Sequence, residues 1–183
     1  MALPTKTARH HPALVALHWL LALMLMVALA MGTFVLSAIP LESPEKIGAL
    51  RGHMVVGVLI GFLMLVRLVV RLRTGHQVAP APGSGNPLLG ALGKVVHWGL
   101  YGLVFAMAAS GMATALLTGL PDLVFGGSGG AIPANLSTLA PRIAHGWIAK
   151  GIAALVVLHV LGAVFHQAVR KDGLMARMWW GPR

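Results

Sequence analysis

The chain contains no cysteine and few charged residues. Only 10% of its 183 residues are charged, and only four are acidic, whereas ordinary soluble domains carry about 25% charged residues. The lack of cysteine excludes disulfides, iron–sulfur clusters, thiolate metal sites, haem attached through Cys-x-x-Cys-His and cysteine nucleophiles. A soluble domain is therefore a poor starting class, and nine histidines are the main soft ligands that remain beside methionine.

The chain is instead rich in hydrophobic residues. Hydrophobic residues make up 57% of it and the mean hydropathy is +0.83, so we expect one domain, residues 1–183, embedded in a lipid bilayer. The formal net charge is +10, but the basic residues flank apolar runs. Such placement favours anionic lipid headgroups and argues against nucleic acid as a partner.

Four apolar stretches are long enough to cross a bilayer, which takes about 20 helical residues. No Asp, Glu, Lys or Arg occurs between Arg9 and Glu42 or between Lys94 and Asp122. The other two stretches contain basic residues whose long side chains can reach the headgroups. The prediction is an all-α integral membrane four-helix bundle with spans at about 13–37, 47–70, 95–119 and 143–169, the first being an uncleaved span and not a signal peptide.

The connections differ in charge, which predicts the orientation. The basic segments are the N-terminus, the second connection and the C-terminus, with Lys6, Arg9, Arg71, Arg73, Lys94, Arg170, Lys171, Arg177 and Arg183. The positive-inside rule therefore predicts that both termini are cytoplasmic. We expect residues 74–93 to form a loose cytoplasmic connection, and the glycine-rich residues 121–141 to form a flexible outer loop.

Histidines inside the spans are costly in lipid and are candidate functional residues. His18 lies about 13 Å along a helix from Arg9, and His159 about 16 Å from Arg170, so both are predicted at matching depth near the cytoplasmic side. His53 and His145 match near the opposite side, because each follows closely on an arginine at a helix start. The histidines outside the spans, His10, His11 and His76, are expected to be solvated.

Two cross-helix histidine pairs at opposite sides of a bundle are what two six-coordinate haems need. Without cysteine, such haems are non-covalent and of b type. A single buried histidine hydrogen-bonded to a backbone carbonyl is the simpler interpretation of any one of them, but it does not explain matched depths. A structural zinc site requires four ligands that converge on one point. Two histidine pairs on opposite sides of the membrane do not supply them.

Other residues near the pairs have two interpretations each. Gly57 and Gly61 either let a macrocycle approach the helix or form a helix-packing face. Five basic residues are either partners of haem propionates or interfacial anchors: Arg51, Arg142 and Lys150 near the outer pair, Arg67 and Arg71 near the inner pair. His97 and His166 are candidates for a supporting, proton-carrying or quinone-contacting role, and either competes as a ligand of the inner pair.

A series of short motifs extends along nearly the whole chain. They are Ala16-Leu17-His18-Trp19-Leu20, Arg51-Gly52-His53, Leu65-Val66-Arg67-Leu68-Val69-Val70-Arg71-Leu72, His97-Trp98-Gly99-Leu100-Tyr101, His145-Gly146-Trp147 and Leu158-His159. In order and depth they resemble the bacterial cytochrome b561 family of four-helix di-haem membrane cytochromes.

The resemblance implies a function and a ligand assignment. His18 and His159 would ligate the cytoplasmic-side haem, and His53 and His145 the periplasmic-side haem. The family implies an inner-membrane protein that transfers electrons between a periplasmic reductant, superoxide in one branch, and the ubiquinone pool. Related cytochromes anchor hydrogenases and other dehydrogenases, so a haem-bearing anchor subunit is the alternative, and a histidine-lined ion or proton transporter is a third. Monomer and oligomer both remain open.

Overall fold

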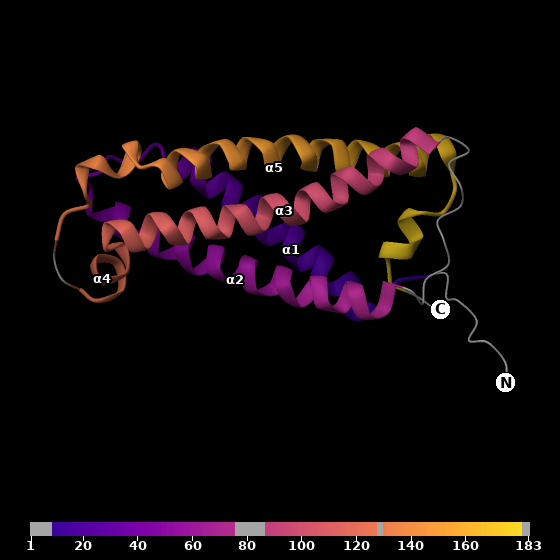
Figure 1. Ribbon diagram of the computed structural model, residues 1–183, viewed down its shortest axis with the longest axis horizontal. Helices are drawn as coiled ribbons and strands as arrows, with labels where there is room; N and C mark the ends of the chain where they lie inside the picture. The colour runs from indigo at the N-terminus through magenta and orange to yellow at the C-terminus, as the bar shows by residue number, and fades with distance from the viewer. Residues whose placement is uncertain (1–8, 76–86, 128–129, 181–183) are drawn as a thin grey trace.

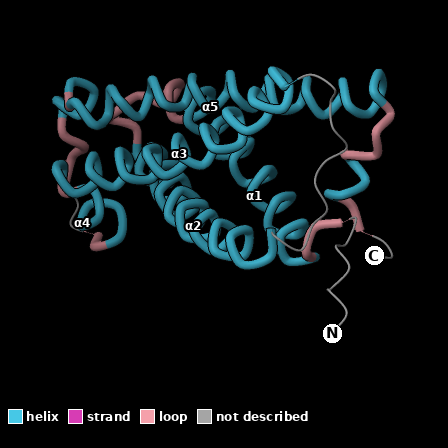
Figure 2. Tube along the Cα trace, turned by 45° about the vertical axis from the view of Figure 1, so that its right-hand side comes forward, coloured by secondary structure: helices cyan, strands magenta, loops and turns pink. Residues whose placement is uncertain are grey.

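The computed structural model describes residues 9–75, 87–127 and 130–180, and these form a bundle of long helices (Figure 1). The long elements are α1 (Pro12–Ala30) with its π-helical extension η1 (Met31–Val35), α2 (Pro44–Thr74), α3 (Pro87–Thr118), and α5 (Ala140–Val164) with its π-helical extension η4 (Phe165–Arg170). The short elements are α4 (Leu120–Phe125), η3 (Ala134–Thr138) and η5 (Met175–Met178). This described part contains no strand (Figure 2), which confirms the all-α prediction.

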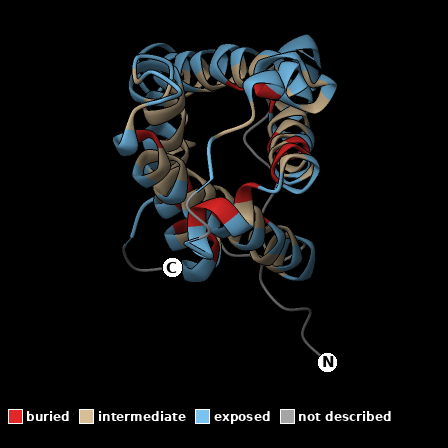
Figure 3. Ribbon diagram, turned by 90° about the vertical axis from the view of Figure 1, so that its left-hand side faces the viewer, coloured by how far each residue is buried: buried red, intermediate tan, exposed pale blue. Residues whose placement is uncertain are grey.

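Four helices are long and apolar enough to cross a membrane: Pro12–Val35, Pro44–Thr74, Pro87–Thr118 and Ala140–Arg170. The four predicted spans are therefore confirmed, although each helix extends beyond its predicted bounds on at least one side. Helix α3 packs on α5, α1 packs on α2, and α2 packs on α3. Seen end-on, the helices surround a common axis (Figure 3). The start of α1 and the short element η5 lie at the end of the bundle opposite α4 (Figure 1), and the side of the membrane that this end faces remains a prediction.

Proline marks the start of every long helix. It is the first residue of α1, α2 and α3 and stands in the first turn of α5, where its missing N–H costs no hydrogen bond. This is why α3 begins at Pro87, and residues 87–93 are helical where a loose connection was expected. His76 and most of that connection, like Lys6 and Arg183, fall outside the described residues.

The expected flexible outer loop is partly a packed cap. Gly119 adopts φ +64°, a left-handed conformation that suits glycine, and turns the chain from α3 into α4. Leu120, Leu123 and Val124 of α4 and Leu136 of η3 are buried in one cluster. The sequence interpretation gave weight to the glycines, whereas the apolar residues between them bury surface against the outer end of the bundle.

The main core lies at mid-bundle and is apolar, with Leu21, Ile60, Met64, Tyr101, Val104 and Ile152 at its centre. A Cβ atom added at Gly61 would lie 3.2 Å from the Ala108 Cβ of α3, whereas one added at Gly57 would meet nothing within 4 Å. Gly61 therefore lets α2 approach α3 closely, which favours the helix-packing interpretation at that position.

We predict that Gly61→Val destabilises the bundle, because the larger side chain forces α2 away from α3. Overpacking of this kind costs about 1–3 kcal/mol. Gly102→Val is the matched control, since Gly102 is exposed on α3 and has open space around it. Thermal unfolding in detergent, followed by circular dichroism, is expected to show a lower midpoint for Gly61→Val alone. Equal midpoints for the two variants would contradict the packing role.

Candidate functional site

The outer histidine pair comes from α2 and α5. The ring centroids of His53 and His145 are 6.1 Å apart and their planes differ by 74°. A glycine makes room for the His145 ring: a Cβ at Gly111 would lie 3.2 Å from Cε1 of His145, whereas one at Gly32 would lie at an ordinary contact distance of 3.5 Å from Cε1 of His53. The structure thus brings together the two outer histidines that the sequence paired by depth.

A serine on α3 lies within hydrogen-bond distance of His145. The Ser110 hydroxyl donates to the Met107 carbonyl at 2.9 Å and lies 3.0 Å from Nδ1 of His145. Because the hydroxyl has one proton and uses it on Met107, it accepts from Nδ1–H of the histidine. The lone pair of Nε2 is then left for a ligand or metal, which is the usual role of such a support.

Three histidines meet at the inner end, one from each of α1, α3 and α5. The ring centroids of His18 and His159 are 6.0 Å apart, and those of His97 and His159 are 5.2 Å apart. The predicted inner pair is therefore close in space, and His97 is its immediate neighbour. His97 was named from the sequence only as a competing or supporting residue.

Two arginines of α2 surround the inner histidines and share one tyrosine ring. Arg67 donates through Nη1 to the Tyr101 hydroxyl at 2.5 Å, and its Nη2 lies 3.4 Å from Nδ1 of His18. The guanidinium carbons of Arg67 and Arg71 lie 5.2 and 5.3 Å from the centre of the Tyr101 ring. Nε of Arg67 is buried and has no hydrogen-bond partner among the described residues. The inner site is thus strongly electropositive.

At the outer end the basic residues have mixed partners. Arg51 donates through Nε and Nη2 to the Val124 carbonyl at 2.8 and 2.5 Å, so it holds α4 against α2. Lys150 lies 4.2 Å from the centre of the Trp147 ring. Lys46, which the sequence analysis missed, is buried and donates to the carbonyls of Leu36 and Ile39. The predicted propionate contacts of Arg51, Arg67, Arg71, Arg142 and Lys150 remain predictions.

The C-terminal residues 174–180 fold back beside the inner site. Trp19 of α1 donates through Nε1 to the Met178 carbonyl at 2.9 Å, and its ring centroid lies 5.7 Å from that of Trp179. The backbone N–H of His10 donates to the Arg177 carbonyl at 3.2 Å. This segment therefore crosses from the end of α5 to the start of α1.

His10 is not solvated as expected. Its Nδ1 is buried without a hydrogen-bond partner among the described residues, and burial, followed by the nearby Arg177 charge, lowers the pKa of His10. The folded-back C-terminal segment covers it, and nothing in the local sequence indicated that contact. His11, by contrast, is exposed and accepts from the Ala13 N–H at the start of α1.

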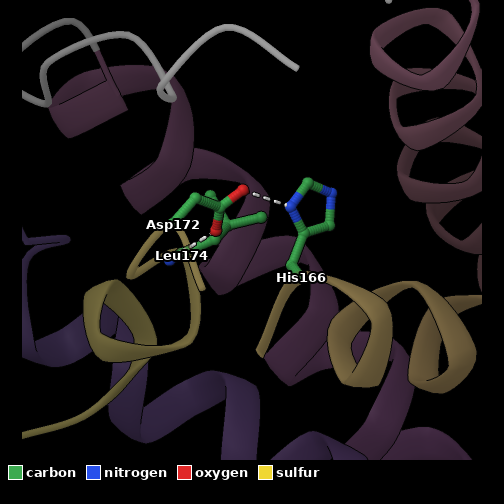
Figure 4. Close-up of polar contacts among 3 residues, drawn as sticks. All are labelled: His166, Asp172 and Leu174. Carbon is green, nitrogen blue, oxygen red and sulfur yellow. Dashed lines mark hydrogen bonds and ion pairs between the residues drawn. The ribbon is translucent and has the colours of Figure 1, made fainter. Parts of the chain in front are cut away.

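His166 forms a pair with Asp172 at the end of α5. Nδ1 of His166 lies 2.6 Å from Oδ2 of Asp172, and Oδ1 of the carboxylate accepts from the Leu174 N–H at 3.1 Å (Figure 4). The hydrogen bond from His166 is the main cause that lowers the pKa of Asp172. His166 was a candidate from the sequence, whereas Asp172 was not. A single acidic residue among basic residues at the end of a helix could have indicated that Asp172 has a partner.

The two pairs fit the cofactor that the sequence suggested. A metal–imidazole bond of about 2.0–2.1 Å on each side places the centroids of two opposed rings about 6 Å apart. The measured separations of 6.0 and 6.1 Å agree with one iron between the members of each pair. The donor set, neutral imidazoles in an apolar bundle, is also the type that haem proteins use.

Comparison with known proteins gives the family. Residues 9–181 match the family described as prokaryotic cytochrome b561. The chain is similar to cytochrome b561 homolog 2 of Escherichia coli K12, with 31% identity over 65% of this chain and 66% of that protein. It is also similar to the probable superoxide oxidase CybB of Yersinia pestis, with 29% identity over 69% of this chain and 72% of that one. The protein therefore belongs to the prokaryotic cytochrome b561 family, multi-pass proteins of the bacterial inner membrane that transfer electrons across the bilayer by b-type haem.

Proposed function

We propose that the protein relays electrons through two b-type haems, from a one-electron reductant on the periplasmic side to a quinone on the cytoplasmic side. The observation that carries the proposal is the presence of two facing imidazole pairs, His53 with His145 and His18 with His159, at nearly equal ring separations. Each pair has one member on α5, and these two members, His145 and His159, are 14 residues apart. This spacing corresponds to about 21 Å along the helix axis. One helix thus supplies a ligand to each side of the membrane.

Bound haem iron would supply the one-electron redox chemistry, and the chain's residues set its conditions. Ser110 holds the proton of His145 on Nδ1 and keeps Nε2 available. The apolar core between the two pairs excludes water. The Arg67 guanidinium beside His18 favours the state with the extra electron, because a fixed cation stabilises added negative charge.

The identity of donor and acceptor rests on more indirect support. One relative is named a probable superoxide oxidase, and superoxide is a small one-electron reductant. Quinone is the proposed acceptor because His97 and His166 offer polar groups near the inner end, where an apolar molecule from the bilayer can be hydrogen-bonded and protonated. His18 is proposed as the partner of His159 at the iron and His97 as a supporting residue, since the ring centroids of His18 and His159 are 6.0 Å apart, whereas those of His97 and His159 are only 5.2 Å apart.

We predict that the purified protein binds about two b haems per chain, one in each bis-histidine site. His159→Ala is expected to remove one haem and to leave the His53 and His145 site occupied. His97→Ala is the discriminating control and should retain both, because His97 is assigned no bond to iron. Haem content is measured as pyridine haemochrome, together with the dithionite-reduced minus oxidised spectrum. A preparation without an α-band, or haem loss in His97→Ala and not in His159→Ala, would refute the assignment.

We further predict that Ser110→Ala changes the outer haem alone. Without the acceptor for Nδ1–H, His145 donates less electron density to iron, so the reduction potential of that haem should rise, and its retention should weaken by about 10–100-fold. Ser37→Ala is the matched control, because the Ser37 hydroxyl bonds only locally to the Thr33 carbonyl. Potentiometric titration of the α-band resolves the two haems. Equal shifts of both haems, or none, would contradict the role of Ser110.

A further inference from the structure

The pair of His166 and Asp172 is the feature that the proposed electron path leaves unused. The sequence holds four acidic residues. Glu42 precedes α2, Glu45 is in the first turn of α2 and Asp122 is in α4, whereas Asp172 follows η4, so it is the one acid at the end of the bundle opposite α4. It points at His166 and is fixed from the other side by the Leu174 N–H (Figure 4). His166 itself stands in the π-helical segment η4, a backbone form that is frequent at functional sites.

The position of the pair places it at the rim of the inner site. Asp172 begins the segment that crosses to α1, where the Trp19 indole donates to the Met178 carbonyl. Trp19 is adjacent to His18, whose ring lies 6.0 Å from that of His159. His166 follows His159 by seven residues on the same continuous helix, which is about 10 Å along the axis and nearly the same face. The pair therefore lies between the inner histidines and the aqueous side.

We propose that Asp172 is the positioning residue that orients His166 and stabilises its charged form, so that His166 donates a proton to a quinone oxygen at the inner site. This inference rests on the proposed quinone reduction. The carboxylate accepts from Nδ1–H, which directs Nε2 away from Asp172. A protonated His166 then has one N–H held by Asp172 and one free to donate, the arrangement that a general acid needs.

The step balances as a two-electron, two-proton reduction. Haem held by the inner pair would pass two electrons to the quinone one at a time, and the outer reductant would supply both. At one quinone oxygen the Nε2–H bond of His166 breaks as an O–H bond forms, and the other oxygen takes its proton from water on the aqueous side. Water on the aqueous side reprotonates Nε2, while Asp172 keeps its hydrogen bond to Nδ1. The products are one quinol and two molecules of oxidised donor, which is dioxygen if the donor is superoxide.

The charges around the pair are otherwise positive. Arg170 lies near enough to act on Asp172. The other titratable or charged groups among the described residues at this end are Arg9, His10 and His11 before α1, His18 on α1, Arg67, Arg71 and Arg73 on α2, Lys94, His97 and Tyr101 on α3, His159 on α5, Lys171 after η4 and Arg177 in η5. Among these groups, Asp172 is the one carboxylate, and it lies 2.6 Å from Nδ1 of His166.

The test separates proton delivery from electron delivery. Haem-loaded full-length protein is reduced, freed of reductant and mixed in stopped flow with a short-chain ubiquinone or with ferricyanide, which takes electrons without protons. Asp172→Asn should slow reoxidation by the quinone by about 100-fold at alkaline pH, the lower range for a positioned proton donor, and shift the alkaline limb of the rate profile to lower pH. Reoxidation by ferricyanide should be unchanged.

Further variants keep the result interpretable. His166→Gln should also slow the quinone reaction, but without a pH-dependent limb, and Asp172→Glu should recover part of the rate. Glu42→Gln, an exposed acid at the other end, is the matched control. Quinone rates for Asp172→Asn equal to wild type at all pH values would overturn the inference and leave quinone reduction standing. Slowing with both acceptors, or loss of haem, would assign Asp172 a structural role instead, and a wild type that quinone fails to reoxidise would refute the proposed function itself.

Discussion

The structure depends on one constraint: imidazoles from different helices must face each other at a fixed separation inside a medium that offers no water. In lipid, each backbone polar group is satisfied within its own helix, so only side-chain packing sets the distance between helices. Close approach at Gly61 and room for the His145 ring at Gly111 are local means by which this chain holds that distance. The two ring separations, 6.0 and 6.1 Å, differ very little although they involve different helix pairs.

The two ends of the bundle apply this constraint in different environments. At the outer end a neutral hydroxyl, Ser110, supports His145, and the nearby Arg51 is engaged with the backbone of α4. At the inner end two guanidiniums crowd Tyr101 and His18, and a third histidine stands beside the pair. Fixed cations close to the inner pair stabilise an added electron at that site.

Much of this arrangement was predictable from the sequence, because it follows from length and periodicity. Uninterrupted apolar runs fix the spans, and the distance of each histidine from the nearest arginine fixes its depth in the membrane. Two residues at equal depth on different helices of one small bundle are separated only by the lateral distance between those helices. This is why His18 with His159 and His53 with His145 could be paired without coordinates.

What the sequence did not predict arises from contacts between distant segments. The burial of His10 depends on the Arg177 segment folding back, and the support of His145 depends on a serine 35 residues away on another helix. The cap formed by α4 and η3 was not predicted, because the glycines and prolines of this segment indicated a loop. Its apolar residues are too few to form a periodic pattern that would predict burial. Local propensity carries no information on which surface such a segment meets.

Helix α5 contributes a histidine to both pairs, and this has a consequence for biosynthesis. A nascent chain that has inserted α1, α2 and α3 holds His18 and His53 in lipid without their partners. Under the proposed ligand assignment, neither haem would gain its second histidine until the last span has entered the membrane and packed against α3. Maturation of both proposed centres would then be coupled to the final insertion event, and a ribosome that stalls before residue 145 would leave a product without either centre.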